Sequence, residues 1–167
     1  MTIVDRLRAL VAELTDDESS PESIGLFLVE QPWISDYSQT PTNARVFAVT
    51  AAEGVHFGLI EHDGSVSDDS PVVMTVPGML DPEESNVIVG ASVSEFLALG
   101  AARGFDNMNA LASGPDEARE WLASASVEGH PAAARLRREL SLGDAFDLDR
   151  FEELQRRYRP LLRFAHA

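Results

Sequence analysis

Apolar side chains in the first fourteen residues recur every three or four positions, at Ile3, Leu7, Leu10 and Leu14. This spacing places them on one face of an amphipathic helix, so the pattern predicts a helix over residues 3–14. Asp5 lies near the start of that helix, where the helix dipole favours a negative charge.

The next stretch has a weaker pattern. Residues 15–23 are acidic and serine-rich and predict a loop, and residues 31–43 contain two prolines and predict irregular structure. The apolar run IGLFLV between them fits two structures. We favour a helix over residues 21–30 that begins at Pro21 with Ser20 as its cap, and a short buried strand is the alternative.

Alternating apolar and polar positions, separated by turn residues, then indicate strands. Residues 51–54 and the pair Asp63-Gly64 are turn signals, and prolines border the third apolar run, where they interrupt few ladder hydrogen bonds. Together these signals predict an antiparallel meander of three or four strands, at residues 45–50, 55–62, 71–77 and 86–90.

From residue 92 onward the apolar pattern is helical. Ser92 and Glu95 have the spacing of a capping box, in which the serine hydroxyl accepts from the Glu95 amide while the glutamate reaches back. We expect Gly104 to end this helix and Pro160 to kink or end the last one. The pattern predicts further helices at residues 106–112, 114–124, 131–140 and 147–162.

These elements predict an α+β fold, with an antiparallel three- to four-stranded meander flanked by an N-terminal helix and a C-terminal set of helices. A chain of 167 residues has the length of one domain. Within this single domain, residues 1–167, we expect residues 1–104 to form the α+β core. Residues 105–167 are expected to form a helical C-terminal extension packed on that core.

Composition adds a strong negative charge. The formal net charge is −15, and residues 1–130 hold 22 of the 28 acidic residues but only 5 of the 13 arginines. Such a field repels phosphate backbones and anionic membranes and attracts basic proteins. We therefore expect no nucleic acid and no membrane. An acidic surface that only keeps the protein soluble is the favoured explanation of the charge, and a basic protein partner is the alternative.

The chain contains no cysteine, which excludes disulfides and thiolate metal sites. Charged residues interrupt every apolar stretch near the N-terminus, so we predict no secretory signal. No apolar run approaches the ~20 residues that are needed to span a bilayer. The sequence therefore favours a cytoplasmic location.

The segment at residues 54–64 combines two histidines, His56 and His62, with two acidic residues. In a strand these histidines share a face but lie about 20 Å apart, because each residue advances the chain by about 3.3 Å. Two ligands of one metal need donor atoms within roughly 4 Å of each other. We therefore predict no metal here, and because phosphate-binding and hydrolase motifs are also absent we predict no cofactor.

The predicted strand places Val55, Phe57 and Leu59 on a core-facing side and His56 on the opposite side, which is either half-solvated or covered by a helix. A histidine in this position is more typical of a structural role than of catalysis, and no catalytic residue is assigned. The alternative is a small hydrolase-type enzyme with a composite site, in which His56 is the general base and Glu61 or Asp63 assists it.

Candidate contact residues for a protein partner are a tryptophan in the irregular segment, the mid-strand histidine and the acidic residues near the predicted hairpin loops. Tryptophan is favoured at the centre of interfaces, although packing over the rim of the core is the preferred explanation here. The acidic run lacks the alternating ligands and closing glutamate of a calcium loop. These candidates are Trp33, Glu53, His56, Glu61, Asp63, Asp68 and Asp69.

Three segments between about residues 45 and 100 carry a resemblance: VFAVTAAEGVHFGLIEHDG, PVVMTVP and VGASVSEFLALG. In this order they resemble the SUKH superfamily, whose fold leads from an N-terminal helical part into a curved antiparallel meander and then further helices. Phe96-Leu97 matches the Phe-Leu pair of the helix that follows the last strand. The resemblance implies a non-enzymatic role, as an immunity protein that neutralises a toxin, often a nuclease, or as a regulatory adaptor.

The arginine-rich segment at residues 147–163 allows a third interpretation. If this helix docks on the acidic part of a second copy of the chain, the protein is an oligomeric scaffold. A homo-oligomer therefore stays open beside the binding module and the enzyme.

Overall fold

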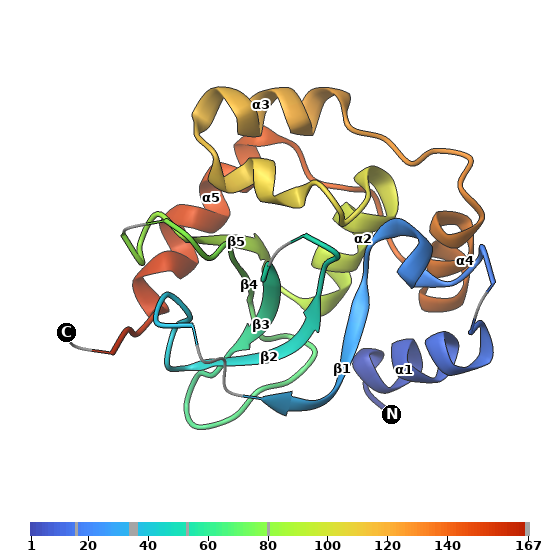
Figure 1. Ribbon diagram of the computed structural model, residues 1–167, viewed down its shortest axis with the longest axis horizontal. Helices are drawn as coiled ribbons and strands as arrows, with labels where there is room; N and C mark the ends of the chain where they lie inside the picture. The colour runs from blue at the N-terminus through green and yellow to red at the C-terminus, as the bar shows by residue number, and fades with distance from the viewer. Residues whose placement is uncertain (16, 34–36, 53, 80, 166–167) are drawn as a thin grey trace.

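The computed structural model describes residues 1–15, 17–33, 37–52, 54–79 and 81–165, without the side chains of residues 31–33. The fold is α+β, as predicted, and combines one antiparallel sheet with helices at both ends of the chain (Figure 1). Five strands form a meander in chain order: β1 (Phe27–Trp33), β2 (Ala44–Val49), β3 (His56–Ile60), β4 (Val72–Thr75) and β5 (Asn86–Gly90).

The favoured helix over residues 21–30 was wrong, and the alternative of a strand is correct. A short 3-10 helix, Pro21–Ile24, ends at Gly25, whose φ of 93° lies in the left-handed region that favours glycine. A Cβ on this glycine would lie 2.1 Å from the Asp106 carboxylate, so the chain turns where no side chain fits. The chain then enters β1, which pairs with β2 and adds the fifth strand to the predicted three or four. It also occupies the start of the segment that was predicted as irregular.

The predicted turn at Asp63-Gly64 is present. His62 and Ser65 exchange two backbone hydrogen bonds of 3.2 Å across it. Both central residues have positive φ, 54° and 78°, which is the geometry of a type I′ turn. The Asp-Gly pair therefore fixes this connection locally.

The α-helices of the described residues are α1 (Ile3–Glu13), α2 (Val93–Arg103), α3 (Pro115–Ser124), α4 (Pro131–Leu140) and α5 (Leu148–Tyr158). The segment predicted as a helix at residues 106–112 is a 3-10 helix, Met108–Ala112, and α5 ends in another, Arg159–Leu161, which contains Pro160. The Ser92 hydroxyl caps α2 as predicted by accepting from the Glu95 amide. The Glu95 carboxylate reaches back one residue farther, to the Ala91 amide at 2.6 Å.

Helix α2 covers one face of the sheet and brings an aromatic cluster into the centre of the core. The rings of Phe57 on β3 and Phe96 on α2 have centroids 4.7 Å apart, and Phe47 and Phe105 pack edge-on against Phe96. All four side chains are buried. The face predicted as core from Val55, Phe57 and Leu59 is therefore the face that α2 covers.

The opposite face is also covered, so β3 is buried on both sides. Helix α5 packs on β5, and the chain after it runs back along residues 42–43 (Figure 1). Asn43 donates to the Leu161 carbonyl at 2.9 Å and accepts from the Arg163 amide at 2.9 Å. Side chains of α4 and α5, among them Leu136 and Leu154, belong to the same hydrophobic core as those of the sheet.

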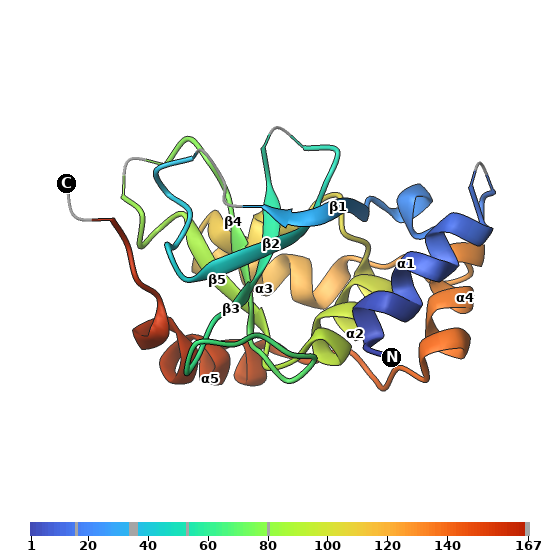
Figure 2. The same ribbon diagram turned by 90° about the horizontal axis from the view of Figure 1, so that it is seen from below.

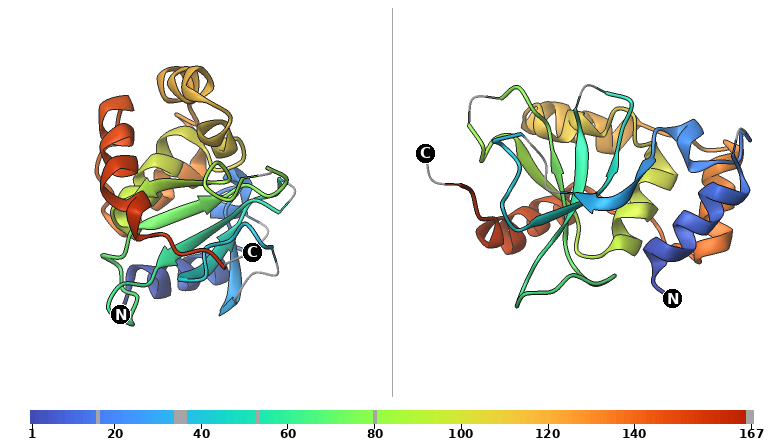
Figure 3. Two further views of the ribbon diagram at one scale, coloured as in Figure 1. Left: turned by 90° about the vertical axis from the view of Figure 1, so that its left-hand side faces the viewer. Right: turned by 60° about the horizontal axis from the view of Figure 1, so that its bottom comes forward.

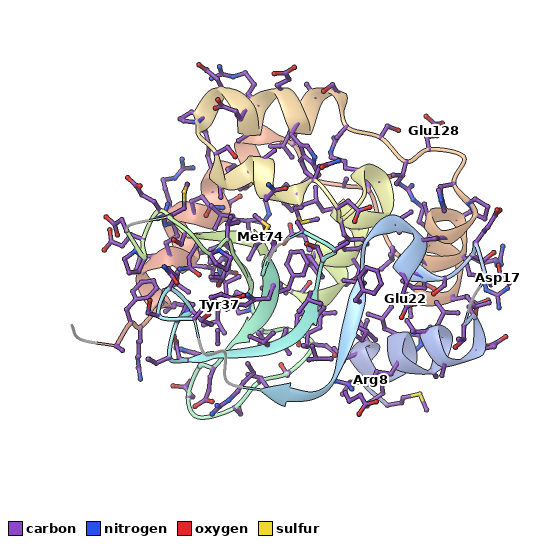
Figure 4. All side chains as sticks on the ribbon, viewed as in Figure 1. Arg8, Asp17, Glu22, Tyr37, Met74 and Glu128 are labelled. Carbon is purple, nitrogen blue, oxygen red and sulfur yellow. The ribbon has the colours of Figure 1, made fainter. Side chains whose placement is uncertain are left out.

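The two edges of the sheet are each approached by a side chain from a helix. Arg8 of α1 donates to the Glu30 carbonyl on β1 at 2.8 Å (Figure 4). On β5, Gln155 of α5 accepts from the Ile88 amide at 2.9 Å and donates to the Ile88 carbonyl at 2.7 Å. One side-chain amide thus replaces the next strand at this point, where an unpaired edge invites pairing between chains.

Replacing Gln155 by alanine is expected to lower the free energy of unfolding by about 1–3 kcal/mol, because both backbone groups of Ile88 lose their partner. Urea unfolding measures this loss. The control is Arg156→Ala on the exposed side of the same helix, which changes helix propensity similarly and should shift stability little. Equal losses in the two variants would contradict a role for Gln155 at the sheet edge.

Candidate binding surface

Three polar side chains form a row across the sheet, on neighbouring strands. His56 of β3 lies opposite Thr75 of β4, and Thr75 lies opposite Asn86 of β5, so the three side chains project from the same face. They are 1%, 1% and 0% exposed. A polar row buried this deeply requires a hydrogen-bond partner for each group.

Asn86 connects this row to two loops. Its Oδ1 accepts from the Thr75 hydroxyl at 2.6 Å, and its Nδ2 donates to the Gln39 and Pro82 carbonyls at 2.8 Å and 2.6 Å. Gln39 belongs to the segment between β1 and β2, and Pro82 to the connection between β4 and β5. A single buried amide therefore holds both loops on the end of the sheet.

His56 holds the same segment from the other end of the row. Its Nδ1 lies 2.6 Å from the Gly54 carbonyl, which can only accept, so this nitrogen carries the proton. Nε2 then accepts from the Thr40 hydroxyl at 2.9 Å. The Tyr37 ring stacks on the imidazole with centroids 5.7 Å apart, on the sheet end marked by Tyr37 in Figure 4.

This environment keeps His56 neutral. Burial lowers the pKa of His56 below its usual value, and the bond to the Gly54 carbonyl only partly opposes that shift. Both ring nitrogens have partners and the side chain is 1% exposed. The geometry is that of a structural histidine, which orders a loop.

The lowered pKa of His56 makes a prediction about acid stability. In the unfolded chain the imidazole titrates near its ordinary value of about 6.5, so below that pH the unfolded state binds a proton that the folded state excludes. The stability that His56 contributes is present above this pH and is lost as the pH falls from there toward the folded-state pKa.

We expect the free energy of unfolding of the wild-type chain, measured with urea, to fall between pH 7.5 and pH 5.5. The His56→Gln variant should lose less free energy of unfolding over the same interval. The control is His62→Gln, which removes an exposed histidine and leaves the surroundings of His56 unchanged. If His56→Gln and the wild type lose the same free energy between these pH values, the neutral, proton-excluding environment of His56 is refuted.

The structure separates the predicted contact residues rather than gathering them. Glu61, Asp63, Asp68 and Asp69 lie in the connection between β3 and β4, on the end of the sheet opposite the polar row (Figure 2). His56 lies at the other end, toward the connection between β2 and β3. Glu53 and the Trp33 side chain are outside the described residues.

The four acidic residues at that end have different roles. Glu61 pairs with Arg45 at 2.5 Å, and Asp63 lies 3.4 Å from His62 in the exposed turn. Asp68 accepts from the Ile3 amide at 2.8 Å, and its carbonyl accepts from the Val93 amide, so it joins the beginnings of α1 and α2. Asp69 is exposed. Asp68 is thus a capping residue, a role that only the folded chain reveals.

A groove that the sequence did not predict lies where α3, α5, the 3-10 helix Met108–Ala112 and the connection between β4 and β5 meet. Its volume is about 510 Å³. Helices α3 and α5 lie beside each other above this side of the sheet (Figure 3). The apolar residues that line it include Met79, Val87, Leu111, Ala118, Leu148 and Phe151. They come from segments up to 72 positions apart, so no local pattern could indicate them.

The polar row supports one wall of this groove. Met79 and Glu84 line the groove from the connection between β4 and β5, the loop that Asn86 holds through Pro82. Arg159 of the last 3-10 helix also donates to the Glu83 carbonyl in this loop. His56 does not line the groove.

The part of the chain that the structure describes contains no group of three or more histidine, aspartate or glutamate side chains that could hold a metal ion. Within the same residues, no helix has the length and apolar character needed to cross a membrane. Comparisons of the chain with known protein families, curated proteins and solved structures find no match.

Proposed function

We propose that this protein is a cytoplasmic binding module that recognises a basic partner protein through its acidic surface. The observation that carries the proposal is a set of exposed carboxylates that form no ion pair among the described residues. Asp17 and Glu128 lie on the outer edge of the molecule (Figure 4). The set comprises Asp5, Asp17, Glu18, Glu22, Glu30, Asp69, Asp81, Glu83, Glu84, Asp106, Glu117, Glu120, Glu128, Asp144, Asp147, Asp149 and Glu152.

Several arginines are already engaged within the chain and leave this charge uncompensated. Arg45 pairs with Glu61, Arg135 with Glu13 and Glu139, and Arg150 with Glu95. Unpaired surface charge of one sign accelerates encounter with a partner of the opposite sign and discriminates against others. A basic protein is the partner class that gains most from this surface.

The resemblance to the SUKH superfamily points to the same class of function. The order of an N-terminal helix, an antiparallel meander and later helices agrees with what that resemblance implies. Nuclease toxins present basic surfaces to nucleic acids, so an acidic inhibitor is complementary to them. Within the proposal, the chain acts as an immunity protein or as a regulatory adaptor.

The geometry gives no support to a hydrolase site around His56, because both imidazole nitrogens are bonded inside the protein and the side chain is buried. The hypothesis of an oligomeric scaffold, in which the arginine-rich segment docks on a second copy of the chain, has less support. Arg150 and Arg159 of the arginine-rich segment bond within the same chain, to Glu95 and to the Glu83 carbonyl. The binding module is the function that the described residues favour.

The test is affinity capture from the host lysate with the tagged full chain, at 50 mM and 300 mM salt, followed by calorimetry with the recovered protein. We expect a stoichiometric basic protein whose affinity falls as salt rises, because exposed charges are screened. Size-exclusion chromatography with light scattering at both salt concentrations separates this from self-association. If no partner is recovered at low salt, or if the partner is not basic, the proposal fails.

A further inference from the structure

We propose that the groove between α3, α5 and the connection between β4 and β5 seats a basic, amphipathic helical segment of the partner protein. The apolar side chains of that segment enter the groove, and its arginines or lysines pair with Glu84 and Glu152 on the rim. This inference rests on the proposed function and names the surface that performs it.

The floor of the groove is apolar and firmly held. Val87, Leu111, Ala118 and Phe151 are each less than a tenth exposed and belong to the continuous core of the protein. A volume of about 510 Å³ lies within the range of pockets that bind small ligands or a few side chains. Burying apolar anchors in such a site supplies affinity that exposed charges alone do not provide.

The charge on the rim of the groove favours a positively charged partner segment. Two glutamates and two arginines line the groove. Arg119 pairs with Asp116 at 3.2 Å, whereas Arg159 donates to the neutral Glu83 carbonyl and keeps its positive charge. Together with the exposed carboxylates just outside the rim, the negative charge exceeds the positive. Glu84 and Glu152 form no ion pair among the described residues and are exposed. A cationic segment is therefore the complementary occupant.

The residues just outside the rim reinforce this sign. Asp81 and Glu83 flank the groove on the connection between β4 and β5, and both are exposed. On α3, Glu117 lies in the first turn, where it also offsets the positive end of the helix. An amphipathic helix presents apolar side chains three and four positions apart with basic ones beside them, which matches an apolar floor bordered by carboxylates.

The probe is a synthetic amphipathic peptide of about four helical turns, with leucines along one face and arginines and lysines elsewhere. Its control has serine in place of every leucine and the same charge. Each is titrated into the full-length ¹⁵N-labelled protein at low salt, and amide shifts locate the binding surface. We expect the leucine peptide to shift Val87, Leu111 and Phe151, and the serine peptide to leave them unchanged.

Matched charge reversals test the rim. Glu84→Lys with Glu152→Lys is expected to lower the affinity for the leucine peptide by about tenfold or more, and tenfold corresponds to about 1.4 kcal/mol. The control Glu18→Lys with Glu22→Lys makes the same change in net charge, on the segment between α1 and β1. It should weaken binding of the leucine peptide much less.

The outcomes separate this inference from the proposed function. If both peptides bind over the whole acidic surface and both double variants lower their affinity equally, the groove is not the binding site. The proposed charge-driven binding is then still supported. If neither peptide binds at low salt, both are overturned. Shifts at the groove that require the leucines and the two rim glutamates support both.

Discussion

Replacing Asn86 by aspartate is expected to destabilise the protein by about 3–5 kcal/mol at neutral pH, although the two side chains have nearly the same shape. The Asn86 side chain is 0% exposed, and its amide group donates to the Gln39 and Pro82 carbonyls. A carboxylate has no hydrogen to donate, so two carbonyls would face a buried negative charge. Urea unfolding at pH 7 measures the loss.

The control is Asn107→Asp, which adds the same charge at an exposed position and should change the free energy of unfolding by less than about 0.5 kcal/mol. Because Asn86 holds the loop that contributes Met79 and Glu84 to the groove, its replacement should also broaden the amide signals of that loop. A variant at Asn86 that is as stable as the Asn107 control would contradict the role of the polar row.

Replacing Phe96 by alanine is expected to cost about 3–5 kcal/mol, because a fully buried ring is removed from the centre of the core. Phe96 contacts the rings of Phe47, Phe57 and Phe105, which come from the sheet and from the chain after α2. The cavity left behind is lined by these rings, and they cannot all move to fill it. Denaturant unfolding gives the midpoint and the slope.

The companion variant is Phe96→Leu, which keeps most of the volume and should cost roughly half as much or less. Phe27→Ala on the edge strand β1 removes a ring that is only half-buried and is also expected to cost less. If Phe96→Ala and Phe27→Ala are equally destabilising, the aromatic cluster is not the centre of the core.

One loop, the connection between β4 and β5, is involved both in the proposed binding and in the stability of the protein. The connection between β4 and β5 carries Asp81, Glu83 and Glu84 on the surface, and it is held from below by Asn86 and from the side by Arg159. A rigidly held loop loses little entropy when a partner binds. In the proposed binding module, the buried polar row would therefore favour recognition by preorganising this loop, without itself contacting the partner.

Local chemistry in the sequence determined most of the elements. Apolar periodicity indicates α1, α5 and the inner strands, because side chains on one face of a regular element share one environment. The cap at Ser92, the end of α2 at Gly104 and the turn at Asp63-Gly64 each depend on residues close together in the chain. These signals need no distant partner, so a pattern can identify them.

Tertiary contacts decided the rest. Residues 27–33 become a strand because they pair with β2, whereas the local pattern of the apolar run at residues 24–29 favoured a helix. The polar row needs the register of three strands, and the groove needs four segments between residues 79 and 159. Likewise, Asp68 became a capping residue because the fold brings Ile3 to it, 65 positions away in the sequence. Such neighbours are set by how the whole chain packs, which no local stretch of sequence specifies.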